Sequence, residues 1–207
     1  MEVKRRSELP GFLLSETAPR PGFMEENKAS SADIGSLTHR FLRLIDLAQF
    51  RDHPGGASET NCAERVEAEL KRMRDKAILT ETEADAIYAQ GAAAFLESDL
   101  GKRLAAAQTL HREWPFTMQV RDDSPTMVQG IVDAAFLEDG QWVLIDYKTD
   151  RDTRPEIFIP RHERQMNWYR TAVERLTDIP VKEMWLFALR AGKAYPVNKM
   201  DINPLRY

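Results

Sequence analysis

Two aspartates and a lysine in the middle of the chain have types and spacing that suggest chemistry. Asp133 precedes a predicted turn at Asp139-Gly140, and Asp146 and Lys148 follow that turn. Asp-Gly between two apolar runs is a strong signal for a two-residue β-hairpin. Counting outward from the turn, Asp133 is expected directly opposite Asp146.

Two opposed carboxylates repel each other unless something compensates for their charge. Directly opposed residues of antiparallel strands have Cβ atoms about 4.5–5.5 Å apart, and like charges there are destabilising. Residues 142–148 are largely apolar on both faces, so the charges are expected at the end of a buried strand. Hard oxygen ligands in such a place suit Mg²⁺ or Mn²⁺, with a substrate phosphate completing the coordination.

Structural roles are the alternative interpretation of the same three residues. An aspartate at a strand end can cap a turn, Lys148 can neutralise Asp146, and a change of one residue in the loop would shift the register. For any one of these side chains alone, a structural role is the commoner expectation. The three together on one face favour a site.

Four ordered motifs extend this pattern to most of the chain. Asp133 followed by Asp146-Tyr147-Lys148 resembles the signature of the PD-(D/E)XK nuclease superfamily, an acid and then acid-x-Lys after a hairpin turn. Gly130-x-x-Asp133 with Asp146-Tyr147-Lys148-Thr149 resembles the RecB-family branch. Gly35-Ser36-Leu37-Thr38-His39 is similar to the upstream G-[ST]-x-x-H of that branch, and Gln165 to Tyr169 to its downstream Q-x-x-x-Y.

The resemblance implies a role for each of these residues. Asp133, Asp146 and Lys148 would be catalytic, and a metal would be held by both aspartates, the imidazole of His39 and the backbone carbonyl of Tyr147. Lys148 would position the attacking water and stabilise charge in the transition state, and whether it is also the base is open. Gln165 and Tyr169 would contact DNA or brace Lys148. Glu113, just ahead of the first predicted strand, would support the site.

Without the resemblance, several of these residues have ordinary explanations. His39 lies roughly opposite the apolar stripe of its predicted helix, which is typical of a solvated residue. Gln165 and Tyr169, four residues apart, equally fit a buried helix face with a polar edge. Residues 151–175 contain six arginines against four acids, which could hold a phosphate backbone but is also typical of a solvated helix.

Cofactors and partners follow from the same resemblance. Cys62 is the single cysteine, which excludes an iron-sulfur cluster held by four thiolates of this chain and separates it from the iron-sulfur members of the branch. Two further stretches, Leu44-Ile45-Asp46-Leu47 after the His39 motif and the run from Asp146 to Arg151, look most like the C-terminal nuclease domain of the AddA subunits of AddAB helicase-nucleases. This implies Mg²⁺- or Mn²⁺-dependent cutting of DNA, as single-stranded ends or unwound duplex, in double-strand-break repair. The implied partners are a helicase portion of the same chain and a second, AddB-like subunit.

Length and composition are those of a globular domain. The chain has 207 residues, 43% of them hydrophobic, and 29 basic against 33 acidic residues give a formal net charge of −4. This balance argues against a generally basic nucleic-acid coat but allows a local basic surface. No apolar run reaches the 18 residues of a membrane span and no secretory signal is present, so a cytoplasmic bacterial protein without membrane contact is expected.

Hydrophobic periodicity predicts the elements that must position the site. Residues 1–30 are expected to be a lead-in or linker and 31–207 the nuclease domain. Three helices are expected first, at 34–48 with Ser31 or Asp33 as cap, at 62–76, and at 81–96 with a capping box of Thr80 and Glu83. Strands and one helix follow, at 115–121, 127–137, 142–148, 161–176 (the helix), 182–189 and 194–198.

This order predicts an α/β fold with a PD-(D/E)XK restriction-endonuclease-like core, a mixed central β-sheet flanked by helices and an N-terminal helical elaboration. Two alternatives to a helicase-linked nuclease remain at this point. One is a catalytically silent nuclease-like domain that binds DNA or another protein chain, and the other is a stand-alone nuclease of the same superfamily. The intact acids and lysine favour an enzyme, because a binding module has no use for opposed carboxylates.

Overall fold

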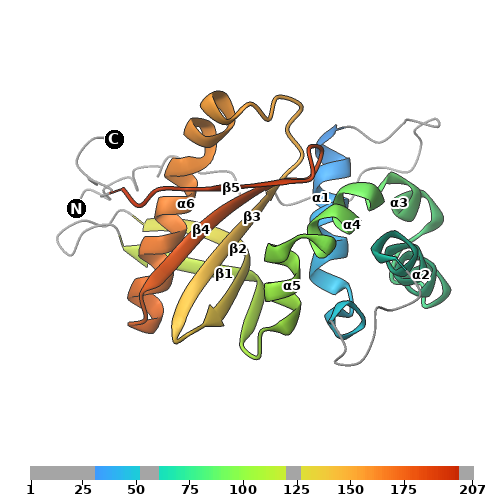
Figure 1. The fold of residues 1–207 in the computed structure, drawn as a ribbon, viewed down its shortest axis with the longest axis horizontal. Helices are drawn as coiled ribbons and strands as arrows, with labels where there is room; N and C mark the ends of the chain where they lie inside the picture. The colour runs from blue at the N-terminus through green and yellow to red at the C-terminus, as the bar shows by residue number, and fades with distance from the viewer. Residues whose placement is uncertain (1–30, 52–60, 120–126, 201–207) are drawn as a thin grey trace, which may run out of the picture.

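One mixed sheet forms the centre of the molecule (Figure 1). The computed structural model describes residues 31–51, 61–119 and 127–200, and the predicted lead-in 1–30 lies outside them. In chain order, the strands are β1 (Leu110–Gln119), β2 (Met127–Glu138), β3 (Gln141–Lys148), β4 (Val181–Ala188) and β5 (Lys193–Pro196). Neighbours in the chain are neighbours in the sheet, and only β3 and β4 are parallel. The predicted fold class is confirmed.

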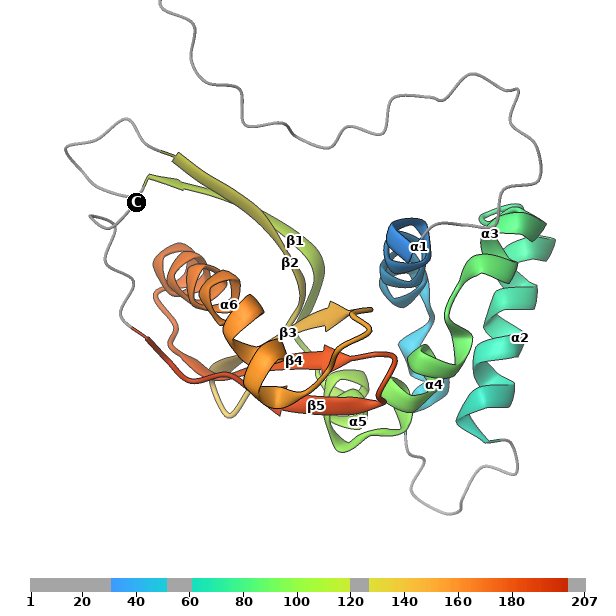
Figure 2. The same cartoon turned by 90° about the horizontal axis from the view of Figure 1, so that it is seen from above.

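Helix α6 (Pro155–Thr177) is the crossover that a parallel strand pair requires, and it covers one face of the sheet (Figure 2). The helix begins six residues earlier than the sequence predicted. Pro155 suits the first turn, where its missing N–H has no helical partner, and Pro160 interrupts the hydrogen-bonding ladder without ending the helix. Fully buried Phe158 anchors this proline-containing stretch.

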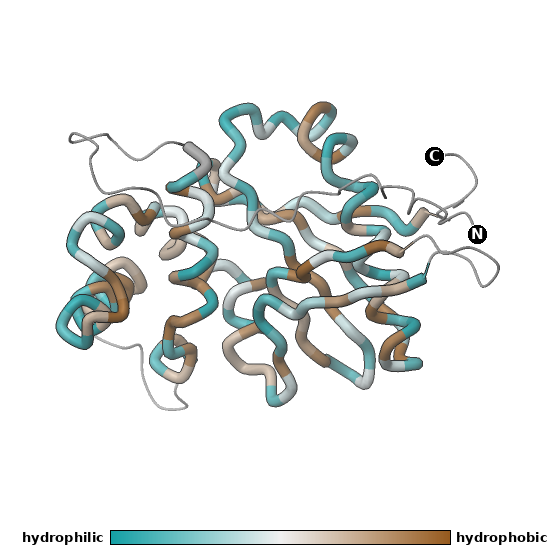
Figure 3. The backbone as a smooth tube through the Cα atoms, turned by 180° about the vertical axis from the view of Figure 1, so that it is seen from behind, coloured by the Kyte–Doolittle hydropathy of each residue, from teal (hydrophilic) through white to brown (hydrophobic). Residues whose placement is uncertain are grey.

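The other face of the sheet is covered by a helical layer that comes from the first half of the described chain (Figure 2). It consists of α1 (Ser31–Leu44), the 3-10 helix η1 (Leu47–Phe50), α2 (Cys62–Asp75), α3 (Glu81–Ala86), α4 (Ala89–Glu97) and α5 (Asp99–Ala106). Phe41, Phe95 and Ile145 share its hydrophobic cluster. Hydrophobic and hydrophilic stretches interchange along the chain, as expected for elements with one buried face (Figure 3). None of the helices in the described residues is long and apolar enough to cross a membrane.

Several helix boundaries correct the sequence prediction. The helix expected at 81–96 is split into α3 and α4, because Ile87 is extended and the N–H of Tyr88 donates to Thr38 Oγ1 of α1 at 3.0 Å. Helix α5 was not predicted. Helix α1 already begins at Ser31, so Ser31 and Asp33 lie within it and not before it. The capping box of Thr80 and Glu83 is confirmed.

Strands β1 and β2 bend together where Glu113 and Asp133 come opposite each other. The pairs on either side, Arg112 with Ala134 and Trp114 with Val132, are formed, whereas these two residues are not paired. Glu113 has a φ of 49°, in the left-handed region. Beyond the bend the ribbon curves away from β3 (Figure 2). Glu113 therefore lies inside β1, which starts five residues before the predicted strand, and not ahead of it.

Arg103 of α5 ties the helical layer to the turn end of the sheet. Its guanidinium donates to Glu138 on β2 at 2.6 and 3.0 Å and to Glu183 on β4 at 2.9 and 3.0 Å. The hydrogen bonds from Arg103 outweigh burial and lower the pKa of Glu138 to about 2. All three side chains are about 30% exposed, so water screens part of the attraction.

Arg103→Met is expected to lower the free energy of unfolding by about 1–2 kcal/mol at pH 7. Because the pKa of Glu138 is lowered from its ordinary 4.5 to about 2, the stabilisation is complete above pH 4.5 and is lost as the pH falls towards 2. Denaturant unfolding of both proteins across this range measures the difference. If the difference in free energy of unfolding between the two proteins stays constant down to pH 2, the stabilisation does not come from the contact between Arg103 and Glu138.

Candidate active site

The β2–β3 hairpin brings the two predicted acids to one end of the sheet. Its observed register pairs Glu138 with Gln141 and continues to Ala134 with Ile145, as the Asp-Gly turn predicted. Asp133 and Asp146 come next in register, just past the last paired residues. At this point the strands separate, and Asp133 Oδ2 accepts a hydrogen bond from the backbone N–H of Tyr147 at 2.8 Å. The expected direct pairing is thus replaced by a side-chain contact to the neighbouring strand.

Asp146 is almost fully buried, with its side chain 2% exposed. Its Oδ2 lies 2.7 Å from Lys148 Nζ but has no hydrogen-bond partner with good alignment. Burial, followed by the charge of Asp133, raises the pKa of this carboxyl group, and the charge of Lys148 offsets only part of the increase. A buried carboxylate oxygen that lacks a full set of partners is a site where a cation would be stabilised.

Lys148 is held from two sides. Besides Asp146, its Nζ donates to Gln165 Oε1 of α6 at 2.9 Å, and Gln165 Nε2 donates to Tyr169 Oη at 2.6 Å. Tyr169 is buried, and burial raises the pKa of its hydroxyl, so it stays protonated. Gln165 therefore contacts the lysine of the hairpin and Tyr169 contacts Gln165, and of the two expected roles of this pair the observed contacts correspond to bracing Lys148.

His39 reaches the site from α1. Its Nδ1 lies 3.4 Å from Asp133 Oδ2, and its ring packs edge to face against Tyr147 with centroids 5.8 Å apart. The side chain is only 27% exposed, so the solvated position that the helical wheel suggested is wrong. Burial lowers the pKa of His39, but the hydrogen bond and charge of Asp133 outweigh it and the net pKa is raised.

Gly35 explains how α1 can approach the end of β3. A Cβ at this position would lie 3.0 Å from Thr149 Oγ1, closer than most real contacts of this kind. The glycine lets the first turns of α1 pass beside the residue that follows Lys148. His39, one turn further along, is thereby placed beside Asp133.

Glu113 binds the helix that carries His39. Its Oε2 accepts a hydrogen bond from Arg43 of α1 at 2.7 Å. Next to it, Arg112 donates to the carbonyls of Leu42 and Ile45 at 3.3 and 2.8 Å. These contacts fasten the end of α1 to the bend in β1. Sequence reasoning missed Arg112, because the predicted strand began at residue 115 and left this arginine outside it.

Asp150 and His162 form a second polar contact beside the lysine that was not predicted. Asp150 lies 3.3 Å from His162 Nε2 and 2.6 Å from Arg161 Nη1. The arginine-rich stretch has further pairs of this kind, with Arg154 bound to Asp152 and Arg170 to Glu174. Several of its arginines are therefore neutralised by nearby acids, which weakens the expectation of a phosphate-binding run.

The donor atoms at the site fit a hard divalent cation. Within the described ranges, no three His, Cys, Asp or Glu side chains are already grouped in metal-binding geometry, since Asp133 and Asp146 are engaged by Tyr147 and Lys148. The carboxylates of Asp133 and Asp146 and the imidazole of His39 nevertheless lie close together, and Asp146 Oδ2 lacks a full set of partners. These are ligand types that Mg²⁺ and Mn²⁺ accept.

Gly130 connects the sheet to the lysine brace. A Cβ at this position would lie 2.7 Å from the Phe116 ring and 3.3 Å from the Tyr169 ring, which pack edge to face at 5.8 Å. Gly130→Ala is expected to cost about 1–3 kcal/mol of stability by overpacking and to slow turnover about tenfold, because Tyr169 holds Gln165 and thus Lys148. Thermal unfolding measures the loss of stability, and the turnover number measures the loss of activity. A variant that is less stable but keeps its full turnover number would show that Gly130 does not influence Lys148.

Comparison with known proteins identifies the family of this chain. A family model described as the PD-(D/E)XK nuclease superfamily matches residues 12–204. The chain is similar to the AddA subunit of the ATP-dependent helicase/nuclease of Geobacillus kaustophilus (30% identity, 85% of this chain and 15% of the relative) and of Desulforudis audaxviator (33% identity, 93% and 17%). It therefore spans about a sixth of the length of these relatives. The chain belongs to the PD-(D/E)XK nuclease superfamily and is homologous to the nuclease region of AddA.

Proposed function

We propose that the chain is a Mg²⁺-dependent deoxyribonuclease domain, the exonuclease module that cuts strands for a helicase-nuclease in double-strand-break repair by homologous recombination. The name of the relatives, which describes an ATP-dependent helicase/nuclease, supports a link to a helicase. Under this proposal residues 31–207 are the nuclease domain. Its partners are a helicase portion of the same chain and a second, AddB-like subunit. It acts on DNA in the bacterial cytoplasm.

The observation that carries the proposal is the placement of Lys148. Its ammonium lies between Asp146 Oδ2 at 2.7 Å and Gln165 Oε1 at 2.9 Å, and the carboxylate of Asp133 is close enough to raise the pKa of Asp146. A domain that only binds DNA has no use for two interacting carboxylates beside a fixed lysine. This arrangement is suited to hydrolysis of a phosphodiester.

PD-(D/E)XK nucleases generally use divalent metals. Here Asp133, Asp146, His39 and the carbonyl of Tyr147 would hold the ion, with Mg²⁺ preferred and Mn²⁺ accepted. When bound, the ion supplies Lewis-acid activation of water and neutralises charge on the phosphate.

The side chains of this chain supply orientation and a fixed positive charge. Lys148, restrained by Gln165, would donate hydrogen bonds to the attacking water and to the phosphate oxygens as negative charge develops. Tyr169 keeps Gln165 in place, and Glu113 with Arg112 keeps α1 and His39 against the bend.

Cleavage of end-labelled single-stranded DNA by the 207-residue chain tests the proposal. Cutting is expected with Mg²⁺ or Mn²⁺ and is expected to fall to background with EDTA, since the carboxylates alone cannot activate water. Calorimetric titration with Mg²⁺, repeated on Asp133→Asn, checks that the ion binds at this site. Metal-independent cutting, or equal Mg²⁺ binding by Asp133→Asn, would overturn the assignment.

A further inference from the structure

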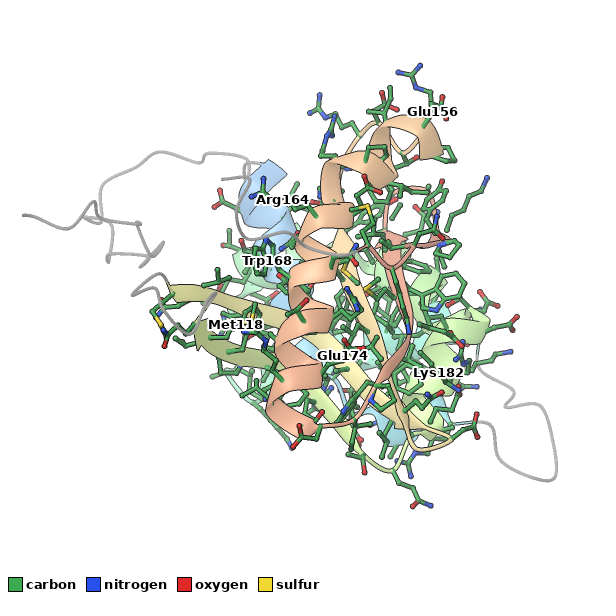
Figure 4. The ribbon with its side chains drawn as sticks, turned by 90° about the vertical axis from the view of Figure 1, so that its left-hand side faces the viewer. Met118, Glu156, Arg164, Trp168, Glu174 and Lys182 are labelled. Atoms are coloured by element: carbon green, nitrogen blue, oxygen red, sulfur yellow. The ribbon has the colours of Figure 1, made fainter. Side chains whose placement is uncertain are left out.

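Two arginines at the start of α6 are already paired with acids. The first turns of this helix extend past the end of the sheet, where Glu156 is labelled in Figure 4. Here Arg154 lies 2.7 Å from Asp152, and Arg161 lies 2.6 Å from Asp150. A phosphate that approached these arginines would compete with carboxylates that are already in place. A cation for the DNA backbone is therefore expected elsewhere around the site.

In the part of the chain that the structure describes, Arg190 is a cation without an acidic partner. It is exposed and lies in the turn between β4 and β5. Its Nε donates to the carbonyl of Thr149 at 2.8 Å, and its guanidinium carbon lies 5.8 Å from the centroid of the Tyr88 ring. Both Nη groups are left without a hydrogen-bond partner among the described residues, so their donors are available to a ligand.

The turn that carries Arg190 is fixed to the catalytic strand and to α4 (Figure 2). The N–H of Leu189 donates to the carbonyl of Lys148 at 2.9 Å. A Cβ at Gly91 would collide with the Tyr88 ring and lie 2.8 Å from the carbonyl oxygen of Leu189, so the glycine lets α4 pack closely against the turn. Because the turn and the Tyr88 ring are both held, Arg190 loses little conformational freedom when it binds a ligand.

The anchor of Arg190 is next to the catalytic lysine. Thr149 directly follows Lys148, and consecutive Cα atoms are about 3.8 Å apart. The Lys148 ammonium extends towards Gln165 of α6, whereas the Arg190 guanidinium lies towards Tyr88 at the start of α4. A DNA strand that passes from one cation to the other therefore crosses the end of β3. Phosphates of one strand recur about every 3.4 Å along a DNA helix, so a strand with one phosphate at Lys148 brings a neighbouring phosphate within reach of Arg190.

The chemistry of a guanidinium selects a phosphate as its ligand. The planar fork of donors matches two oxygens of one phosphate, and hydrogen bonds between charged groups are about twice as strong as those between neutral groups. We propose that Arg190 binds a backbone phosphate next to the scissile one and so positions the DNA strand across Lys148. Arg190 is thus a positioning residue and does not touch the reacting atoms. The inference rests on the proposed function and adds to it a residue outside the four sequence motifs.

Arg190→Gln tests this inference, with Arg51→Gln as the matched control. Arg51 is also exposed and its Nε also donates to a backbone carbonyl, that of Ala105, at 2.8 Å, but it follows η1 beyond the far end of α1. Fluorescence anisotropy in EDTA measures the Kd of a fluorescein-labelled 15-nucleotide oligo-dT at several salt concentrations. Arg190→Gln is expected to raise Kd about tenfold and to lower the slope of log Kd against log salt by about 0.7, because one phosphate contact is lost. Arg190→Lys is expected to keep the slope, and Arg51→Gln to keep both the slope and Kd.

Cleavage kinetics separate this role from a purely structural one. Arg190→Gln is expected to raise KM for oligo-dT by the same factor as Kd and to change kcat little, since the lost contact is made equally in the substrate complex and in the transition state. A fall in kcat with unchanged Kd would assign Arg190 to the support of Lys148 through Thr149 and overturn the inference. Unchanged Kd in a folded Arg190→Gln variant, or no binding of oligo-dT by the unchanged chain, would overturn it as well. Because binding is measured without metal, a chain that binds oligo-dT through Arg190 but does not cut it would contradict only the proposed nuclease function.

Discussion

Asp146→Asn is expected to reduce DNA cleavage by at least about a thousandfold and to leave the fold as stable as before or more stable. The loss of activity follows from the proposed metal site, where the amide is a much poorer ligand than a carboxylate for a hard cation. If the transition state loses several kcal/mol of stabilisation by the metal, the rate falls by about three powers of ten.

The expected stability of this variant follows from the buried charge. Burial and Asp133 raise the pKa of Asp146 above its ordinary value of 3.8, so the ionised carboxylate is less favourable in the folded chain than in the unfolded one. The Asp146 carboxyl group therefore makes the folded chain progressively less stable as the pH rises above that ordinary value, and the asparagine variant lacks this contribution. Lys148 keeps Gln165 as a partner, which limits the cost of losing the ion pair.

Denaturant unfolding from pH 3 to pH 8, together with cleavage assays, checks both effects. The stability of the variant relative to the unchanged chain is expected to rise with pH. If Asp146→Asn fails to fold at pH 7, the ion pair between Asp146 and Lys148 is required for folding. That result would contradict the expectation that the buried carboxylate lowers the stability of the folded chain.

Lys148→Met is expected to lower the turnover number by about a hundredfold to a thousandfold and to change Mg²⁺ affinity little. The ammonium is the positive charge that can meet the developing charge of the phosphate, and losses of this size are typical when such a donor is removed. Arginine is not expected to restore activity, because its planar guanidinium cannot occupy the place of an ammonium between Asp146 and Gln165.

Gln165→Leu separates the role of the lysine from that of its brace. With Lys148 present but less restrained, a loss of about tenfold in turnover number is expected. The rate of single-turnover cleavage at saturating Mg²⁺ is compared for Lys148→Met, Lys148→Arg and Gln165→Leu. A Gln165→Leu loss as large as that of Lys148→Met would mean that Gln165 itself contacts the reacting groups, while activity retained by Lys148→Met would remove the lysine from the chemistry.

The sequence by itself determined the hairpin and the fold class. Asp-Gly between two apolar runs specifies the turn, and the turn specifies the register that brings Asp133 and Asp146 to the same end of β2 and β3. Strand and helix periodicities likewise predicted the order of elements around the mixed sheet. Such signals are local, because the turn geometry and the alternation of side chains depend on neighbours in the chain.

Tertiary structure decided how the site is assembled from separate elements. The bend at Glu113, the contact of His39 with Asp133 and the place of Gln165 beside Lys148 depend on how α1 and α6 pack against the sheet. The helical wheel put His39 in solvent because it counts only the strongest apolar side of α1, whereas in the fold the histidine side also packs, against Tyr147. Residue spacing fixes which side of an element a group occupies, but only packing between elements fixes what that side meets.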